Sequence, residues 1–182
     1  MAPIFNLKLY IRVNIGTILQ EFSSFMKNYQ QILFIVLLFC VSNSAFSQQF
    51  SIDQLRKFNE MDLAAFKKEI KEVHKYSYYD KTQTDEFHLF EYDSPDYVNK
   101  ISKFDYLKDK SSNMVEFSTT DEKLFNSYKK NILSLGYKET GTGKIPGGEV
   151  YKDYAKNELR LRLVFPKENT QPPKSYTVIV VK

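Results

Sequence analysis

Two arginines on one predicted strand are the residues best suited to bind a ligand. In NELRLRLVF, residues 157–165, leucines alternate with Arg160 and Arg162. Successive side chains of a strand point to opposite faces, so both arginines project from the face opposite the leucines. Two guanidinium groups side by side suit a carboxylate or a phosphate. The simpler interpretation is a solvated face on which each arginine pairs with an acidic residue of a neighbouring strand.

A glycine-rich segment, GTGKIPGG at residues 141–148, is the second candidate binding site. A phosphate-binding loop is not expected, because its spacing needs glycine where Lys138 stands and Ser or Thr after Lys144. We expect a flexible hairpin loop instead. Loops carry binding function more often than cores do, so Gly143 and Lys144 remain candidate binding residues.

Catalytic side chains are scarce in this chain. The serines lack the G-x-S-x-G turn of a hydrolase nucleophile. His74 ends a predicted helix, where an imidazole caps backbone carbonyls, and His88 alternates with Phe90 on a predicted strand. Glu91 is three residues from His88 and so faces the other way, which argues against zinc. No catalytic residue, metal ligand or cofactor is predicted.

Three helix starts position these candidates. Ser51 with Gln54 forms a capping box, and Asp62 and Asp121 are further N-caps. The apolar stripes are Leu63, Phe66, Ile70 and Val73 after the second cap, and Leu124, Phe125, Tyr128, Ile132 and Leu135 after the third. The lysines and glutamates opposite the second stripe are interpreted as a solvated surface rather than a basic ligand site.

Eight antiparallel strands are predicted from short runs with a period of two. They cover residues 76–80, 86–93, 103–106, 114–118, 137–140, 149–154, 158–165 and 176–181. Residues 94–102 fit either a short helix or a strand. The order is helices, four strands, a helix and four strands.

The two halves of this order align with each other. FKKEIKEVHKYSY from Phe66 matches YKKNILSLGYKE from Tyr128 at an offset of 62 residues. The sequence therefore predicts an α+β fold of two pseudo-repeated units, about 51–118 and 121–182. Each unit would pack an amphipathic helix on a four-stranded antiparallel sheet.

The segment before this domain has the features of a secretory signal peptide. Its apolar run, residues 32–41, has ten residues, whereas a membrane-spanning helix needs about 20. Small residues place a cut after Ser47, which gives a signal peptide at 26–47 and an export route to the periplasm or the extracellular space. Residues 1–25 would then be a mis-assigned upstream start or an extended n-region. The only cysteine, Cys40, lies in the signal, so the mature chain is free of cysteine. An uncleaved anchor is the alternative.

Charge gives little support for a polyanionic partner. The 182 residues have a net charge of +4, and residues 1–47 contain three of the 26 basic and one of the 22 acidic side chains. The remaining 135 residues therefore have a net charge of +2. Basic and acidic residues alternate closely, so no nucleic-acid partner is predicted. This length suits a single domain with its own core.

The signal ending SAFSQQ, the short charged helix, the aromatic strands and MVEFSTTDEKLFNSYKKNILSLGYKE resemble small secreted proteins of unknown function from Gram-negative bacteria. The resemblance covers most of residues 26–182 and implies no activity. The helix-plus-four-strand order is also similar to β-lactamase-inhibitor-type and outer-membrane assembly lipoprotein-type folds, whose members act through protein contacts. The lipid-anchor cysteine motif of the latter is missing.

The leading hypothesis is a non-enzymatic exported module that binds a protein or envelope component through its sheet face or through residues 141–148. One alternative is a small hydrolase or lyase that uses carboxylates brought together across the sheet. The other is a structural envelope protein whose partner is a second copy of itself.

Overall fold

The computed structural model describes residues 49–181. The chain divides after Ser47 into two units, residues 1–47 and 48–182. The predicted signal peptide at 26–47, the upstream residues 1–25 and Cys40 lie outside the described residues. Within residues 49–181, no helix has the length and apolar character needed to cross a membrane.

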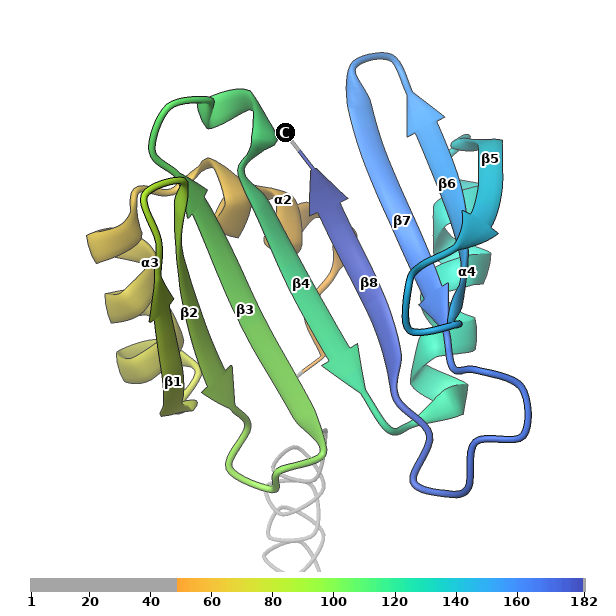
Figure 1. The fold of residues 1–182 in the computed structure, drawn as a ribbon, viewed down its shortest axis with the longest axis horizontal. Helices are drawn as coiled ribbons and strands as arrows, with labels where there is room; N and C mark the ends of the chain where they lie inside the picture. Colours follow the sequence, from red (N-terminus) through yellow and green to blue (C-terminus); the bar gives the residue numbers. More distant parts are fainter. Residues whose placement is uncertain (1–48, 182) are drawn as a thin grey trace, which may run out of the picture. The chain divides into compact units, whose positions relative to one another are not determined.

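The described residues form an α+β fold around one eight-stranded antiparallel sheet (Figure 1). The helical elements are α2 (Ile52–Glu60), α3 (Leu63–Lys68), the π-helical turn η1 (Glu69–Val73), the 3-10 turn η2 (Lys110–Ser112) and α4 (Glu122–Ser134). The strands are β1 (Ser77–Gln83), β2 (Phe87–Asp93), β3 (Asn99–Tyr106), β4 (Met114–Thr119), β5 (Lys138–Lys144), β6 (Val150–Lys156), β7 (Leu159–Phe165) and β8 (Tyr176–Val181). The predicted order of helices and strands is confirmed.

The strand order of the sheet is β1-β2-β3-β4-β8-β7-β6-β5. The last strand of the chain therefore pairs with β4 in the middle, and β1 and β5 are the two edges (Figure 1). Each edge strand contains a register shift, between Tyr78 and Asp80 in β1 and between Glu139 and Gly141 in β5. A bulge of this kind bends and twists an edge strand.

All three predicted helix starts are confirmed by their capping bonds. The Ser51 hydroxyl accepts the Gln54 amide at 3.1 Å, and the Gln54 side chain accepts the Ser51 amide at 2.8 Å. Asp62 accepts the amide of Ala65, and Asp121 caps α4 in the same way. These bonds satisfy amides that have no partner within the helix.

The apolar stripe of the second helix ends earlier than the sequence predicts. Phe66 and Ile70 are fully buried, but Val73 is 57 % exposed. The reason is the π-helical turn η1, in which the His74 amide donates to the Glu69 carbonyl at 3.2 Å. The wider turn rotates Val73 outward and brings the ring of His74 into the core.

Residues 94–98 form a turn, which settles the open choice between helix and strand. The Tyr97 amide donates to the Ser94 carbonyl, and the Asn99 amide donates to the Ser94 hydroxyl at 2.9 Å. Tyr97 has a left-handed backbone with φ of 58°. Such a residue cannot continue a right-handed helix, so β3 begins at Asn99.

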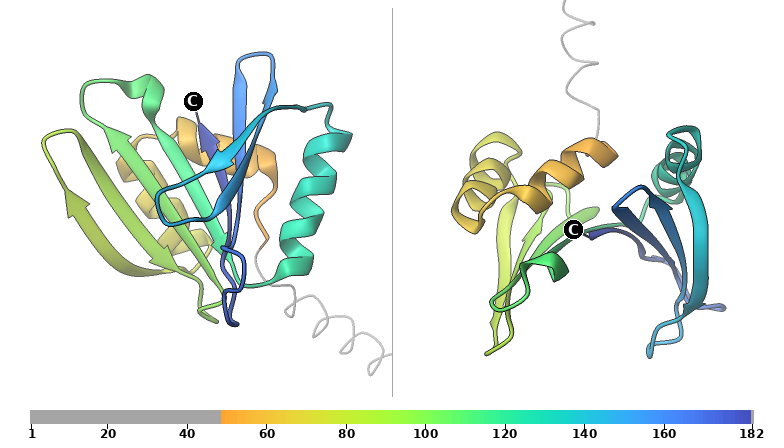
Figure 2. Two further views of the ribbon diagram at one scale, coloured as in Figure 1. Left: turned by 45° about the vertical axis from the view of Figure 1, so that its right-hand side comes forward. Right: turned by 90° about the horizontal axis from the view of Figure 1, so that it is seen from above.

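The core lies between the sheet and the α-helices. Helices α2, α3 and α4 are on the same side of the sheet, and within residues 49–181 no α-helix covers the other side (Figure 2). The sheet curves so that this open face is concave (Figure 2). Helices α2 and α4 both contact the central strands β4 and β8. The buried side chains of these two strands are Val115, Phe117, Thr119, Tyr176, Val178 and Val180.

Candidate functional site

The open face of the sheet contains most of the predicted binding residues and a row of charged side chains. Strand register places one residue from every strand in a line across this face. From β1 to β5 the line is Asp80, Glu91, Ser102, Glu116, Ile179, Arg162, Asp153 and Gly141. Side chains in such a line are cross-strand neighbours and interact directly.

Arg162 is held in place by its neighbours on β6. Its Nε lies 2.7 Å from Asp153 Oδ1 and its Nη2 lies 3.0 Å from Oδ2, a bidentate pair. The guanidinium also stacks on the Tyr151 ring, 3.9 Å from the centroid. Hydrogen bonding to Asp153 raises the pKa of Arg162. The simpler interpretation from the sequence, pairing with an acidic residue across the sheet, therefore describes Arg162.

Arg160 differs from Arg162, although both project from the same face of β7. Its side chain is exposed, and within residues 49–181 it makes no ion pair with a carboxylate. It lines two adjoining hollows of about 550 and 580 Å³. The hollow of about 550 Å³ is also lined by Arg162, Met114, Ile179 and Val181, so the Arg160 cation stands beside apolar groups.

Gly143 and Lys144 lie in a strand, which corrects the prediction of a loop over residues 141–148. Strand β5 continues to Lys144, and the turn to β6 follows it. Gly143 pairs with Tyr151, and a Cβ at this glycine would come 2.6 Å from the Tyr151 hydroxyl. Gly143 therefore makes room for the ring on which Arg162 stacks. Lys144 is exposed at the end of β5.

Glu116 is a residue of this face that sequence reasoning missed. It lies on β4 in the middle of the row, with Ser102 on one side and Ile179 on the other. Burial raises the pKa of Glu116, and the charge of Glu91 raises it further. The alternation in MVEFS places Glu116 on the face of the strand that the two apolar core residues do not occupy. Only the strand order puts Glu116 at the centre of the sheet.

The two histidines are away from the open face. The His74 ring packs edge-on against Phe50 and Phe58, with centroids 4.9 and 5.6 Å apart. Burial lowers the pKa of His74, and the Glu69 carboxylate partly offsets this effect. His88 is half-buried with its ring 6.4 Å from that of Phe90. Among residues 49–181, no group of three or more His, Cys, Asp or Glu side chains is arranged to hold a metal ion.

Comparisons with protein-family models, curated proteins and solved structures give no significant match to this chain. Function is therefore inferred from the geometry of the open face. That geometry has three parts: a fixed Arg162, an Arg160 that makes no ion pair within residues 49–181 and stands beside apolar side chains, and a half-buried carboxyl at Glu116.

Proposed function

We propose that residues 48–182 form an exported, non-enzymatic module that binds a protein or envelope component through the open face of its sheet. The observation that carries the proposal is Arg160, an exposed guanidinium without an ion pair in the described part of the chain, at the junction of two hollows. An exposed sheet face that combines a free cation with apolar side chains suits a carboxylate-bearing protein segment.

The surroundings of Arg160 support a specific mode of binding. Met114, Ile179 and Val181 line the hollow of about 550 Å³ and offer apolar contact to a ligand side chain. Asp153 holds Arg162 in one orientation, so that side chain is already ordered before a ligand arrives. Arg160 then provides the charged hydrogen bonds, which contribute about 1.5–3 kcal/mol when formed with a charged partner.

A duplicated architecture is the second part of the proposal. Ile70 and Ile132, 62 residues apart, are both fully buried. Their carbonyls accept the amides of Tyr76 and Tyr137 at 3.1 and 3.2 Å, and each tyrosine immediately precedes an edge hairpin. The bulges of β1 and β5 lie at the same place in these hairpins. These matches support a repeated helix-plus-four-strand unit and the similarity to inhibitor-type folds that bind proteins.

Affinity capture with matched variants tests the binding proposal. The full chain, Arg160→Gln and Lys130→Gln are immobilised in parallel and exposed to envelope extract and culture fluid. Lys130 is an exposed residue of α4, on the other side of the sheet, so its variant controls for the loss of one charge. We expect a protein that the wild type and Lys130→Gln capture and that Arg160→Gln loses.

The captured protein is then purified and titrated. Arg160→Gln should weaken its binding at least tenfold, about 1.4 kcal/mol. Equal capture by all three forms would remove the open face from the proposal. Recovery of the chain itself as the only partner would favour the self-associating alternative.

A second candidate, a hydrolase or lyase that uses carboxylates, is favoured by Glu116 alone. Burial and the charge of Glu91 both raise the pKa of Glu116, as a general acid requires. Carboxyl titration by NMR, with Glu116→Gln used to assign the signal, measures this pKa. A pKa at or below the usual glutamate value would remove the enzyme hypothesis.

A further inference from the structure

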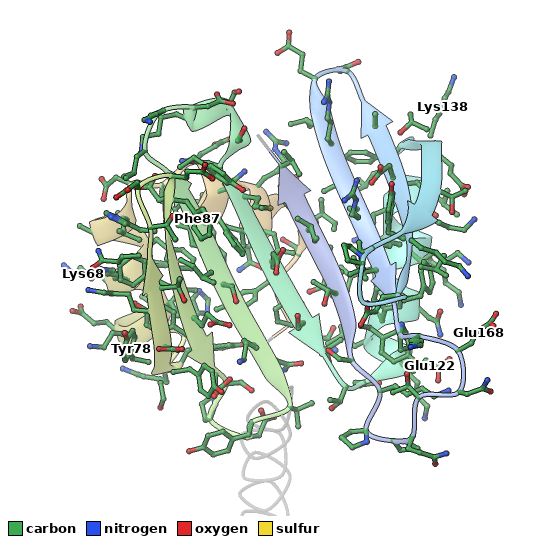
Figure 3. The ribbon with its side chains drawn as sticks, in the orientation of Figure 1. Lys68, Tyr78, Phe87, Glu122, Lys138 and Glu168 are labelled. Carbon is green, nitrogen blue, oxygen red and sulfur yellow. The ribbon has the colours of Figure 1, made fainter. Side chains whose placement is uncertain are left out.

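A basic cleft lies on the helix side of the sheet, at the β1 edge. Its volume is about 730 Å³, and five lysines line it: Lys67, Lys68, Lys71, Lys75 and Lys81. They come from α3, from η1 and the residues after it, and from β1. Figure 3 shows Lys68 and Tyr78 close to the same outer edge. Glu72 is the one acidic residue of the lining.

The lysines of this cleft outnumber its carboxylates by five to one. Elsewhere Lys100, Lys110 and Lys152 each pair with an acidic side chain, at 3.7, 2.8 and 2.9 Å. Within residues 49–181, no ion pair joins any of the five cleft lysines to a carboxylate. Like charges gathered in this way repel one another, and a bound anion relieves the repulsion.

The floor of the cleft is aromatic. Phe90 and Tyr92 are buried, and the ring of Tyr78 is 51 % exposed. The Lys67 ammonium lies 3.6 Å from the centroid of the Phe90 ring. Burial lowers the pKa of Lys67, and the charge of Lys81 lowers it further. Lys67 is thus a cation that the ring orients and that no acidic group neutralises in the described part of the chain.

We propose that this cleft binds a ligand with two or more phosphate groups. Five lysines line one cavity, and a lysine binds phosphate as a point charge without the fixed geometry of arginine. The exposed ring of Tyr78 offers an apolar surface to the rest of the ligand. The site is independent of the open face, because it lies on the helix side of the sheet.

The phosphate groups have two possible sources, a soluble molecule or a lipid headgroup. Pyrophosphate is the soluble probe, titrated by calorimetry into the full chain. Vesicles of phosphatidylcholine with and without cardiolipin, whose headgroup contains two phosphate groups, are the lipid probe, used in a sedimentation assay. Binding to pyrophosphate alone assigns a soluble ligand, and binding only to the vesicles with cardiolipin assigns a headgroup.

Two double variants test the location of the site. Lys67→Gln with Lys81→Gln removes two charges from the cleft. Lys129→Gln with Lys130→Gln removes two charges from α4, at positions that align with Lys67 and Lys68 in the sequence. We expect the cleft variant to bind at least tenfold more weakly and the α4 variant to bind as the wild type does.

Three outcomes would overturn the proposal. They are no saturable binding of either probe, an equal loss in both double variants, or binding that the cleft variant retains. Circular dichroism checks that the variants are folded. If the cleft variant does not fold, Tyr78→Glu replaces it. Position 78 is exposed and tolerates a polar residue, and the new glutamate adds a carboxylate beside the lysines. Unchanged binding by Tyr78→Glu would then overturn the proposal.

Discussion

The hairpin β1–β2 and the hairpin β5–β6 occupy the same place at opposite edges of the sheet, yet their charges are arranged differently. Just before the bulge, Tyr78 of β1 pairs with Tyr92, and Glu139 of β5 pairs with Tyr154. Glu139 binds the Lys152 ammonium at 2.9 Å. Tyr78 offers no carboxylate, and the five lysines of the adjacent cleft make no ion pair with a carboxylate within residues 49–181.

A basic cleft therefore depends on the absence of a carboxylate at the position of Tyr78 as much as on the lysines. Both halves have a pair of lysines on the helix, Lys67 and Lys68 in α3 and Lys129 and Lys130 in α4. On the strands, Lys81 of β1 makes no ion pair with a carboxylate in the described part of the chain, whereas Lys152 of β6 pairs with Glu139.

The largest effect is expected at Lys103, a buried lysine of β3. The corresponding residue of β7 is Leu163. These two residues hold corresponding places in the sheet. Lys103 pairs with Phe90 and Leu163 pairs with Lys152. Phe90 and Lys152 in turn belong to the second residue pair after the bulge in their hairpins. The Lys103 ammonium donates to the carbonyls of Phe58 and Asn59, at the end of α2, at 2.8 and 2.9 Å.

Lys103→Leu should therefore lower the free energy of unfolding by about 2–4 kcal/mol, because two buried carbonyls lose a charged donor. Chemical denaturation measures the loss. The control, Leu163→Met, conserves volume and should cost less than about 1.5 kcal/mol. A Lys103→Leu protein as stable as the wild type would mean that the two halves do not differ in this requirement.

The second prediction exchanges the residues that distinguish the two hairpins. Tyr78→Glu places a carboxylate next to the cleft and should weaken pyrophosphate binding by about tenfold, or 1.4 kcal/mol. Glu139→Gln removes the partner of Lys152 but leaves the cleft intact, so pyrophosphate binding there should not change. Calorimetry at low and high salt measures both affinities. A stronger loss in Glu139→Gln than in Tyr78→Glu would contradict the comparison.

The third prediction concerns Tyr76 and Tyr137, the tyrosines that precede the two edge hairpins. Burial raises the pKa of Tyr76, and the charge of Asp96 adds to the effect. Burial also raises the pKa of Tyr137, but the charge of Arg56 opposes it. A folded pKa above the unfolded value of about 10 gives stability that is complete below pH 10 and is lost as the pH rises through the folded pKa.

Thermal unfolding between pH 7 and 11 should therefore show that stability falls above pH 10. Tyr76→Phe should reduce this fall more than Tyr137→Phe does. The Tyr76 hydroxyl is buried without a hydrogen-bond partner among the described residues, so Tyr76→Phe should not reduce stability at pH 7. Tyr97→Phe, at an exposed position, is the control. Identical pH profiles for Tyr76→Phe and the wild type would contradict the prediction.

The smallest effect is expected on the open face, where Asp153 and Glu91 hold corresponding places. Asp153 binds Arg162 through two short hydrogen bonds, whereas Glu91 lies 3.7 Å from the Lys100 ammonium. Asp153→Asn should cost about 1 kcal/mol and Glu91→Gln less than about 0.5 kcal/mol of unfolding free energy. Denaturation in urea, which leaves ion pairs unscreened, measures both losses of unfolding free energy. A larger loss in Glu91→Gln than in Asp153→Asn would contradict the prediction.

The parts of the fold that local chemistry determines were predictable from the sequence. The caps at Ser51, Asp62 and Asp121 need only residues within one turn, and all three helices begin there. Val73 was predicted wrongly because a period of 3.6 residues cannot anticipate a π-helical turn. Residues 94–98 remained open because Ser94 favours both a helix cap and a turn.

The candidate sites depended on pairings that the sequence does not contain. Alternation placed Arg160 and Arg162 on one face of a strand, but only the register of β6 with β7 shows that Asp153 pairs with Arg162 and leaves Arg160 available. The lysines of α3 and η1 fit a solvated surface until Lys81, on another element, joins them in one cavity. Glu116 becomes central only because β8 returns to pair with β4.

The bulges of β1 and β5 have a consequence for the behaviour of concentrated protein. A free strand at the edge of a sheet is a template on which another chain adds hydrogen bonds and starts an aggregate. In this protein both edges are interrupted, at Tyr78–Asp80 and at Glu139–Gly141, so neither presents a regular ladder to an approaching strand. The bulges that bend and twist the two edge strands therefore also oppose fibre growth from the edges of the sheet.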